Sequence, residues 1–252
     1  VLDSKDLESQ MIEAYNKGLK SLEEGDVLFA AKNFNIVENI YPQSIWAPRS
    51  VLMAAYSYYS QDYYGDAISE LKRFIKNYPI NDSTPYAYFL LATCYFELIV
   101  DEKKDLSSII KSREYYNLII KKYPNTDFAL DAKFKLLLID SILASKEIYL
   151  GKYYLEKKKW IPAMNRFKNV INNFEETEYV EEALHRLVEI NYILGLEEEA
   201  KKYAILLGYN YQSSEWYKES YRVFNKKYQN PRDKIKKNKE NKIIKKFKEL
   251  FK

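Results

Sequence analysis

The side chains best suited to metal binding or nucleophilic attack are scarce in this sequence, which has one cysteine, Cys94, and one histidine, His185. A single cysteine excludes a disulfide within the chain and a thiolate zinc cluster, and a single histidine excludes a metal site built on a histidine pair. Cys94 lies in an apolar stretch of helical character, Leu90–Tyr95. We therefore expect a buried, unreactive thiol rather than a nucleophile.

Acidic residues are numerous, but their spacing predicts no catalytic pair. General acid–base catalysis needs two titratable groups that converge in a pocket, and a nucleophile needs a base oriented beside it. Runs such as Glu197–Glu199 are typical of a solvated helix surface. His185, flanked by Glu181, Glu182 and Glu189, is likewise expected on a solvated helix face rather than in a metal site. The sequence thus predicts a protein that is not an enzyme, without catalytic residues, metal or cofactor.

Side chains suited to binding proteins are abundant, since the chain has 25 tyrosines. Tyrosine joins a large apolar ring to a polar tip and is common in protein interfaces, although a coding bias toward Tyr, Lys, Ile and Asn would give the same excess. In the helical arrangement argued below, one set of side chains lines the inner face of the N-terminal half. This set is Tyr15, Arg49, Leu52, Tyr56, Tyr59, Tyr86 and Phe89. It suits an extended peptide with aromatic side chains, with or without a terminal carboxylate, unless these rings pack between repeats instead.

The elements that must position these residues are predicted to be helices. The chain is 47% hydrophobic, which supplies a core, and it has only 6 Gly and 7 Pro, too few for a β-fold with many tight turns. Three Tyr-Pro pairs, at Tyr41, Tyr78 and Tyr123, follow stretches of helical period, and their prolines are spaced by 37 and 45 residues. Each proline would end a pair of helices.

Small and aromatic residues recur in fixed register with these prolines. They are Gly18, Ala30 and Phe34; Ala55, Tyr58, Ala67 and Leu71; Ala92, Tyr95, Ser112 and Tyr116; and Gly151, Tyr154, Ala163 and Phe167. This is the pattern of tetratricopeptide repeats, in which small residues lie where two helices cross closely. Leu184, Leu187 and Ala200 suggest a degenerate fifth repeat. The sequence therefore predicts an all-α solenoid of about five helix pairs.

Two segments interrupt the regular spacing. Asp101–Ser108 is inserted between the helices of the third repeat and should be a surface loop. Residues 126–157 should form one helix of roughly 28 residues that links repeats 3 and 4, because Gly151 is their only Gly or Pro. We thus expect an N-terminal extension at 1–10, repeats 1–3 at 11–125, the long helix and repeats 4–5 at 126–224, and a tail at 225–252.

The tail is strongly basic, with 12 Lys/Arg against 3 Asp/Glu in residues 225–252, whereas the rest of the chain has 28 against 33. Ile243, Ile244, Phe247, Leu250 and Phe251 follow a helical period between lysines. Such a segment can lie on an anionic membrane surface or remain a disordered, solubilising tail. Nucleic acid is not an expected partner, because the body is acidic and has no base-reading motif.

The sequence also resembles the BamD (YfiO) family of outer-membrane β-barrel assembly lipoproteins, over roughly residues 11–224. The stretches that carry the resemblance are Tyr41–Ser44, Ala55–Tyr59, Arg73–Ile75, the loop Asp101–Asp105, Tyr123–Thr126, Lys146-Glu147, Gly151–Tyr154, and Trp160, Ala163, Asn165 and Arg166. The inserted loop and the long helix are more specific to this family than the repeats alone.

The resemblance implies a protein at the periplasmic face of the outer membrane, in the complex that inserts β-barrel proteins. It implies that the N-terminal repeats bind unfolded barrel proteins, and that the C-terminal repeats bind a periplasmic domain of BamA beside other lipoproteins of the complex. Trp160, Asn165 and Arg166 match the segment that contacts BamA, with Arg166 as the charged contact unless it is simply solvated. The family's lipid anchor would be a cysteine at the mature N-terminus that this sequence does not contain, so the sequence either starts after that cysteine or is that of a non-lipidated relative. The alternative is a general tetratricopeptide adaptor of another bacterial complex.

Overall fold

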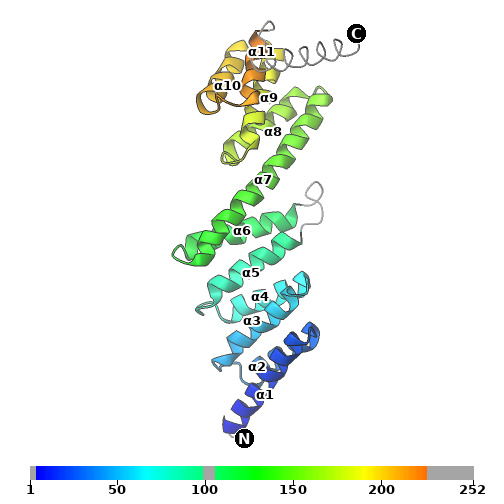
Figure 1. Cartoon of the computed structure of the whole chain (residues 1–252), viewed down its shortest axis with the longest axis vertical. Helices are drawn as coiled ribbons and strands as arrows, with labels where there is room; N and C mark the ends of the chain where they lie inside the picture. Colours follow the sequence, from blue (N-terminus) through cyan, green and yellow to red (C-terminus); the bar gives the residue numbers. More distant parts are fainter. Residues whose placement is uncertain (1–3, 99–105, 226–252) are drawn as a thin grey trace, which may run out of the picture. The chain divides into compact units, whose positions relative to one another are not determined.

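The computed structural model describes residues 4–98 and 106–225, and the secondary structure in these residues is entirely helical. The helices are α1 Ser4–Glu23, α2 Val27–Ile40, α3 Trp46–Tyr59, α4 Tyr64–Asn77, α5 Thr84–Glu97, α6 Ser107–Lys122, α7 Asp127–Glu156, α8 Trp160–Asn173, α9 Tyr179–Ile193, α10 Glu197–Asn210 and α11 Glu215–Phe224 (Figure 1). Consecutive helices pair as antiparallel hairpins, as in tetratricopeptide repeats. The predicted fold class is thereby confirmed, while the number of repeats stays a prediction.

The Tyr-Pro pairs end helices as predicted. Tyr41, Tyr78 and Tyr123 are the C-cap residues of α2, α4 and α6, and each donates its backbone N–H to a carbonyl in the last turn of its helix. The following proline cannot continue a helix, because its ring fixes φ and it lacks an N–H donor. These pairs therefore set where one hairpin stops and the next begins.

The turns inside the hairpins share one backbone geometry. Gly25, Asp62, Lys158 and Gly195 have positive φ, and each immediately precedes the N-cap residue of the second helix of a hairpin. The N-cap residue then donates its N–H to the carbonyl five residues earlier, at 2.8–3.0 Å in all four turns. Four turns with the same hydrogen bond confirm that these hairpins are structural repeats.

Small residues allow the two helices of a hairpin to cross closely. A Cβ added to Gly18 would lie 2.8 Å from the Phe34 ring, and one added to Gly151 would lie 2.6 Å from the Phe167 ring. Both phenylalanines are fully buried. The glycines predicted from sequence register therefore lie directly against the aromatic residues predicted with them.

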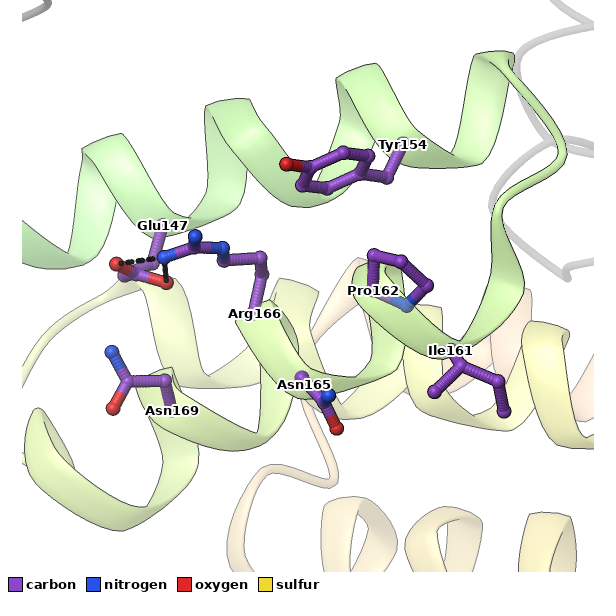
Figure 2. Close-up of a pocket in the computed structure, with 7 residues that line it drawn as sticks. All are labelled: Glu147, Tyr154, Ile161, Pro162, Asn165, Arg166 and Asn169. Carbon is purple, nitrogen blue, oxygen red and sulfur yellow. Dashed lines mark hydrogen bonds and ion pairs between the residues drawn. The ribbon is translucent and has the colours of Figure 1, made fainter.

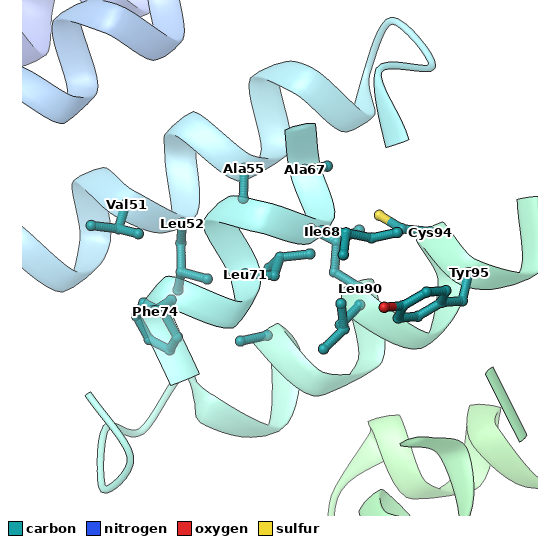
Figure 3. Close-up of a cluster of buried hydrophobic side chains, with 12 residues drawn as sticks. Val51, Leu52, Ala55, Ala67, Ile68, Leu71, Phe74, Leu90, Cys94 and Tyr95 are labelled. Carbon is teal, nitrogen blue, oxygen red and sulfur yellow. The ribbon is translucent and has the colours of Figure 1, made fainter. Parts of the chain in front are cut away.

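The core between successive hairpins is built from aliphatic side chains around these crossings. Figure 3 shows one such cluster, in which α3, α4 and α5 contribute. Its buried members include Val51, Leu52, Ala55, Ala67, Ile68, Leu71, Phe74, Leu90 and Leu91. Cys94 belongs to the same cluster and is fully buried, and this burial raises the pKa of its thiol to about 12. The predicted burial of Cys94 is confirmed.

The predicted long helix is present as α7, with 30 residues. Contacts divide the chain inside this helix into two compact units, residues 1–139 and 140–252, while the predicted boundary before residue 126 stays a prediction. At the N-terminus, α1 begins at Ser4, within the segment predicted as an extension. The predicted insertion is mostly outside the described residues, and its last two residues, Ser107 and Ser108, belong to the first turn of α6.

A helix that the sequence analysis did not predict, α11, covers α9 in the C-terminal unit. His185 is only 4% exposed there, and its Nδ1 lies 2.9 Å from the Ser220 hydroxyl of α11. The Trp216 ring lies 5.2 Å from the imidazole. The expectation that His185 lies on a solvated helix face was therefore wrong, because α11 buries that face. The basic tail lies outside the described residues except for Asn225.

Candidate functional site

The residues predicted to line the N-terminal groove lie on α1, α3 and α5, the first helices of three successive hairpins. Two of them belong to the core: Tyr15 is 6% exposed and Leu52 is 8% exposed. The Tyr15 ring packs edge-on against Phe34 and Trp46, with ring centroids 5.3 Å apart in both pairs. In this conformation Tyr15 and Leu52 support the surface from beneath rather than offer their side chains to a partner.

Arg49 lies on the surface above these rings. Its guanidinium carbon lies 5.7 Å from the centroid of Tyr15 and 5.8 Å from that of Trp46, which is cation–π distance. Arg49 is exposed and forms no ion pair within the part of the chain that the structure describes. Its charge is therefore held in place by aromatic rings while remaining available to an anionic group.

The remaining predicted residues form one aromatic surface with a ring that the prediction did not include, Phe128. Phe89 lies 5.6 Å from Phe128, and Tyr86 lies 5.7 Å from the same ring. Burial raises the pKa of Tyr86 to about 12, with smaller contributions from its neighbours Tyr56 and Tyr59. We call Tyr56, Tyr59, Tyr86, Phe89 and Phe128 the aromatic surface. Tyr56 is its most accessible member, at 41% exposure.

A second candidate surface lies between α7 and α8 in the C-terminal unit. It is a groove of about 390 Å³ lined by Glu147, Tyr154, Ile161, Pro162, Asn165, Arg166 and Asn169 (Figure 2). Arg166 and Asn165, which the sequence analysis selected, both line it. Trp160, also selected, begins α8 and is half-buried but does not line the groove. We call this the α7–α8 groove.

The charge in the α7–α8 groove is internally paired. The Arg166 Nη1 donates to both carboxylate oxygens of Glu147, at 3.1 and 3.2 Å, and the Arg166 side chain is 40% exposed. This pair uses only one guanidinium nitrogen, so the remaining N–H groups can still reach an acceptor on a partner. Ile161 is 60% exposed at the rim, which adds an apolar contact beside the charge.

The sequence analysis missed four residues of these surfaces: Trp46, Phe128, Glu147 and Ile161. Trp46 and Phe128 lie in the first turns of α3 and α7, just after the loops that begin with Tyr-Pro, so their proximity to the neighbouring repeat was a usable signal. Glu147 was part of the stretch that resembles the known family but was not identified as the partner of Arg166. That pairing crosses from α7 to α8 and needs the hairpin geometry to be seen.

The described residues hold no group of three or more His, Cys, Asp or Glu side chains arranged to bind a metal ion. In the same residues, every helix is too short or too polar to cross a lipid bilayer. Both candidate surfaces instead present aromatic, apolar and charged side chains at the protein surface. Such groups are suited to contact with polypeptides.

Comparison with known proteins identifies the family. The family described as YfiO, outer membrane lipoprotein, matches residues 7–206. The chain belongs to the YfiO family. This match spans both the aromatic surface and the α7–α8 groove, whereas α11 and the basic tail lie beyond it.

Individual YfiO-family relatives are similar over most of their length. The chain is 40% identical over 228 residues to the outer membrane protein assembly factor BamD of Rickettsia prowazekii, covering 90% of each chain. It is 39% identical over 211 residues to that of Caulobacter vibrioides, covering 84% of this chain and 69% of the relative. Among solved structures, the tetratricopeptide domain of P58(IPK) matches with a TM-score of 0.45 at 12% identity, covering 88% of this chain and 67% of that one.

Proposed function

We propose that this chain is a non-catalytic scaffold of the outer-membrane β-barrel assembly complex, located at the periplasmic face of the outer membrane. The observation that carries the proposal is the 40% identity to an outer membrane protein assembly factor over 90% of both chains. The N-terminal unit binds unfolded barrel proteins through the aromatic surface and Arg49. The C-terminal unit binds a periplasmic domain of BamA through the α7–α8 groove, beside other lipoproteins of the complex.

Two features support peptide binding by the N-terminal unit. Tyr56 and its neighbours present ring faces and edges, which bind apolar and aromatic side chains at low cost in conformational entropy. The unpaired cation of Arg49 lies on the first helix of the same repeat and can pair with a carboxylate of the polypeptide. An unfolded chain of a barrel protein offers both kinds of group.

The α7–α8 groove supports a contact between folded domains. The Arg166–Glu147 pair fixes the guanidinium at the groove wall, so little side-chain entropy is lost when a partner acceptor binds it. Ile161 and Pro162 supply an exposed apolar rim beside it. A partner domain that places an acidic side chain next to an apolar patch would fit this arrangement.

The first test measures the dissociation constant between the purified chain and the periplasmic domains of BamA from the same organism. Arg166→Glu should weaken binding by about 30-fold or more, as expected for loss of one charge-assisted contact. Lys168→Glu is the matched control, because it makes the same charge change at an exposed position of α8 outside the groove. It should leave the constant within about two-fold, the small effect of a charge at the rim of an interface.

A double variant separates loss of contact from loss of structure. Glu147→Arg combined with Arg166→Glu keeps an internal ion pair across the groove but exchanges its poles. If the double variant folds and still fails to bind, BamA binding requires the positive charge at position 166 itself and not only an ion pair across the groove. Equal affinity of the chain, Arg166→Glu and Lys168→Glu would refute the groove as the BamA site, and no binding at all would favour a tetratricopeptide adaptor of another complex.

A second test addresses the aromatic surface. Tyr56→Ala combined with Tyr86→Ala should weaken binding of a peptide from a barrel-protein strand by about 10-fold or more, since buried aromatic contacts often dominate affinity. Tyr209→Ala, at an 84% exposed position of α10, is the control and should have no effect. Unchanged peptide affinity in the folded double variant would remove the aromatic surface from the proposal.

A further inference from the structure

The two most exposed large hydrophobic side chains in residues 4–98 and 106–225 are isoleucines of the N-terminal unit. Ile80 is 96% exposed and Ile45 is 87% exposed. Neither contributes to the core, and Ile45 stands at the N-cap of α3, a position where Ser, Thr, Asp or Asn would stabilise the helix. These two isoleucines therefore do not stabilise the fold, and a functional reading depends on whether they lie together on one surface.

Both isoleucines lie in loops at the same end of the hairpins. Ile45 ends the loop between α2 and α3, and Ile80 lies in the loop between α4 and α5. The Tyr78 hydroxyl joins these loops, since it lies 2.9 Å from Glu38 Oε1 and 3.4 Å from the carbonyl oxygen of Pro42. The two loops that contain Ile45 and Ile80 are thus linked by a hydrogen bond and do not move independently.

The start of α1 lies along the same edge of the N-terminal unit. Because α1 and α2 are antiparallel and joined by a short turn, the first residues of α1 lie at the end of the hairpin where α2 stops and the Ile45 loop begins (Figure 1). The matching family is described as an outer membrane lipoprotein, and the family resemblance implies a lipid anchor at the N-terminus, ahead of this helix. The exposed isoleucines therefore face the side from which a membrane tether would arrive.

The residues around the isoleucines suit the boundary between lipid and water. Tyr41 is 46% exposed, and tyrosine concentrates at membrane interfaces, where its ring enters the lipid and its polar tip stays hydrated. Trp46 packs against Tyr15 and supports this edge from beneath. Arg49 and Lys76 are exposed nearby and can keep their charges in the headgroup region. This composition differs from the concave, continuous apolar surface that a bound helix or strand requires.

We propose that this edge, formed by Tyr41–Trp46 and Tyr78–Ile80, inserts into the lipid surface to which the protein is tethered, with Ile45 and Ile80 as the inserted side chains. The inference rests on the outer-membrane location in the proposed function. Tethering raises the local concentration of lipid around the edge, so two isoleucines that would bind vesicles weakly on their own suffice to dock it. Docking would fix the orientation of the N-terminal unit relative to the membrane.

The test places one fluorescent probe at a time on the full chain and records whether lipid surrounds it. The parent chain should take up no thiol-reactive dye, because Cys94 is fully buried. The variants Ile45→Cys and Ile80→Cys are labelled with an environment-sensitive dye. Gln61→Cys, at an exposed turn on the opposite end of the same hairpin as Ile45, is the matched control. An N-terminal oligohistidine tag binds each protein to phosphatidylcholine vesicles that contain a nickel-chelating lipid.

Uncharged phosphatidylcholine at 0.15 M salt is chosen because the basic tail should not bind it. Dyes at positions 45 and 80 should shift to the blue and be quenched by spin-labelled lipid, whereas the dye at 61 should remain quenchable by iodide. Adding Ile45→Ser to the labelled Ile80→Cys chain should lower the equilibrium constant between inserted and uninserted forms by about ten-fold, as expected for loss of one buried aliphatic side chain.

Equal access of iodide to all three positions would overturn the proposal. A blue shift that appears without lipid as protein concentration rises would also overturn it, because the edge would then bind a second copy of the chain. No BamA or barrel peptide is present in this experiment. Its failure is therefore distinguishable from failure of the proposed function, which the binding measurements with Arg166→Glu and Tyr56→Ala test separately.

Discussion

At the scale of single residues, two glycines determine how closely paired helices cross. Gly18 and Gly151 each face a fully buried phenylalanine ring at a distance that leaves no room for a methyl group. Gly65 of α4 has no atom within 4 Å of the position where a Cβ would stand. The same substitution therefore has opposite consequences at these positions.

We predict that Gly151→Ala lowers the free energy of unfolding by about 1–3 kcal/mol, because the added methyl group must displace the buried Phe167 ring. Gly65→Ala should instead raise it by about 0.5–1 kcal/mol, since alanine loses less backbone entropy in a helix. Urea unfolding followed by helical circular dichroism measures both. Equal effects of the two substitutions would show that the crossing at Gly151 is not tight.

Glu189 links two positively charged or chargeable neighbours in the C-terminal unit. Its carboxylate oxygens lie 2.7 Å from Arg186 Nη1 and 3.5 Å from His185 Nε2. Burial by itself would raise the pKa of Glu189, but the hydrogen bonds from His185 and Arg186 outweigh it and lower the pKa to about 2. The ionised form is thus favoured in the folded chain.

A carboxyl group whose pKa is lower in the folded state stabilises the fold above its unfolded pKa, and this stabilisation is lost as the pH falls. We expect Glu189→Gln to destabilise the chain most near pH 6–7. The difference from the parent chain should shrink as the pH falls from about 4.5, the ordinary value, toward about 2. Glu176→Gln, at an exposed position, is the control in the same denaturation series. A pH-independent difference for Glu189→Gln would contradict this account.

The candidate surfaces were only partly predictable from the sequence. Counting repeat positions put Tyr56 and Tyr86 on the first helices of their hairpins, because the register of a tetratricopeptide repeat fixes which face of a helix a residue occupies. Arg166 was selected only through the family resemblance. It did not distinguish exposed Tyr56 from buried Tyr15, since burial depends on how the next hairpin packs. His185 was misplaced for the same reason: the helix that buries it starts 30 residues later in the sequence.

At the scale of helices and turns, the fold followed from signals that act locally. The Tyr-Pro pairs end helices because proline cannot continue one, and the stretch before Gly151 forms a single helix because nothing interrupts it. Short α11 was missed because its ten residues carry no repeat register, although Ser214 caps it by accepting a hydrogen bond from the Trp216 N–H at 3.1 Å. The start of α1 was not predicted because the residues before Met11 precede the first position of the first repeat, so the repeat pattern gives no signal for them.

The hairpin turns give a prediction at this scale. Lys158 has φ of 55°, in the left-handed region that glycine occupies at the equivalent positions 25 and 195. This conformation costs a residue with a Cβ roughly 1–2 kcal/mol. Lys158→Gly should therefore raise the free energy of unfolding by up to about 1 kcal/mol, after the greater entropy of glycine in the unfolded chain is subtracted. The reciprocal change, Gly195→Lys, should lower the free energy of unfolding. Thermal unfolding measures both variants, and a destabilised Lys158→Gly or a stabilised Gly195→Lys would contradict the prediction.

At the scale of the whole molecule, contacts divide the chain within α7 into two compact units, each with its own hairpins and core. In repeat proteins each hairpin contacts mainly its neighbours, so a local change should affect nearby hairpins more than distant ones. Gly18 and Gly151 offer equivalent crossings in the two units, because each would place a Cβ against a buried phenylalanine. They can therefore test whether the units share one unfolding transition.

We predict that amide hydrogen exchange in Gly151→Ala becomes faster in α8, α9 and α10, with little change in α1–α4. In Gly18→Ala the acceleration should instead be confined to α1–α4. The reason is that backbone amides exchange through the cheapest local opening that exposes them, and each substitution lowers the cost of opening only where its helices cross. Uniform acceleration along the chain in both variants would mean that α7 transmits cooperativity between the units. In that case, binding at the aromatic surface could change the stability of the α7–α8 groove, and the two binding measurements would have to be repeated with both partners present.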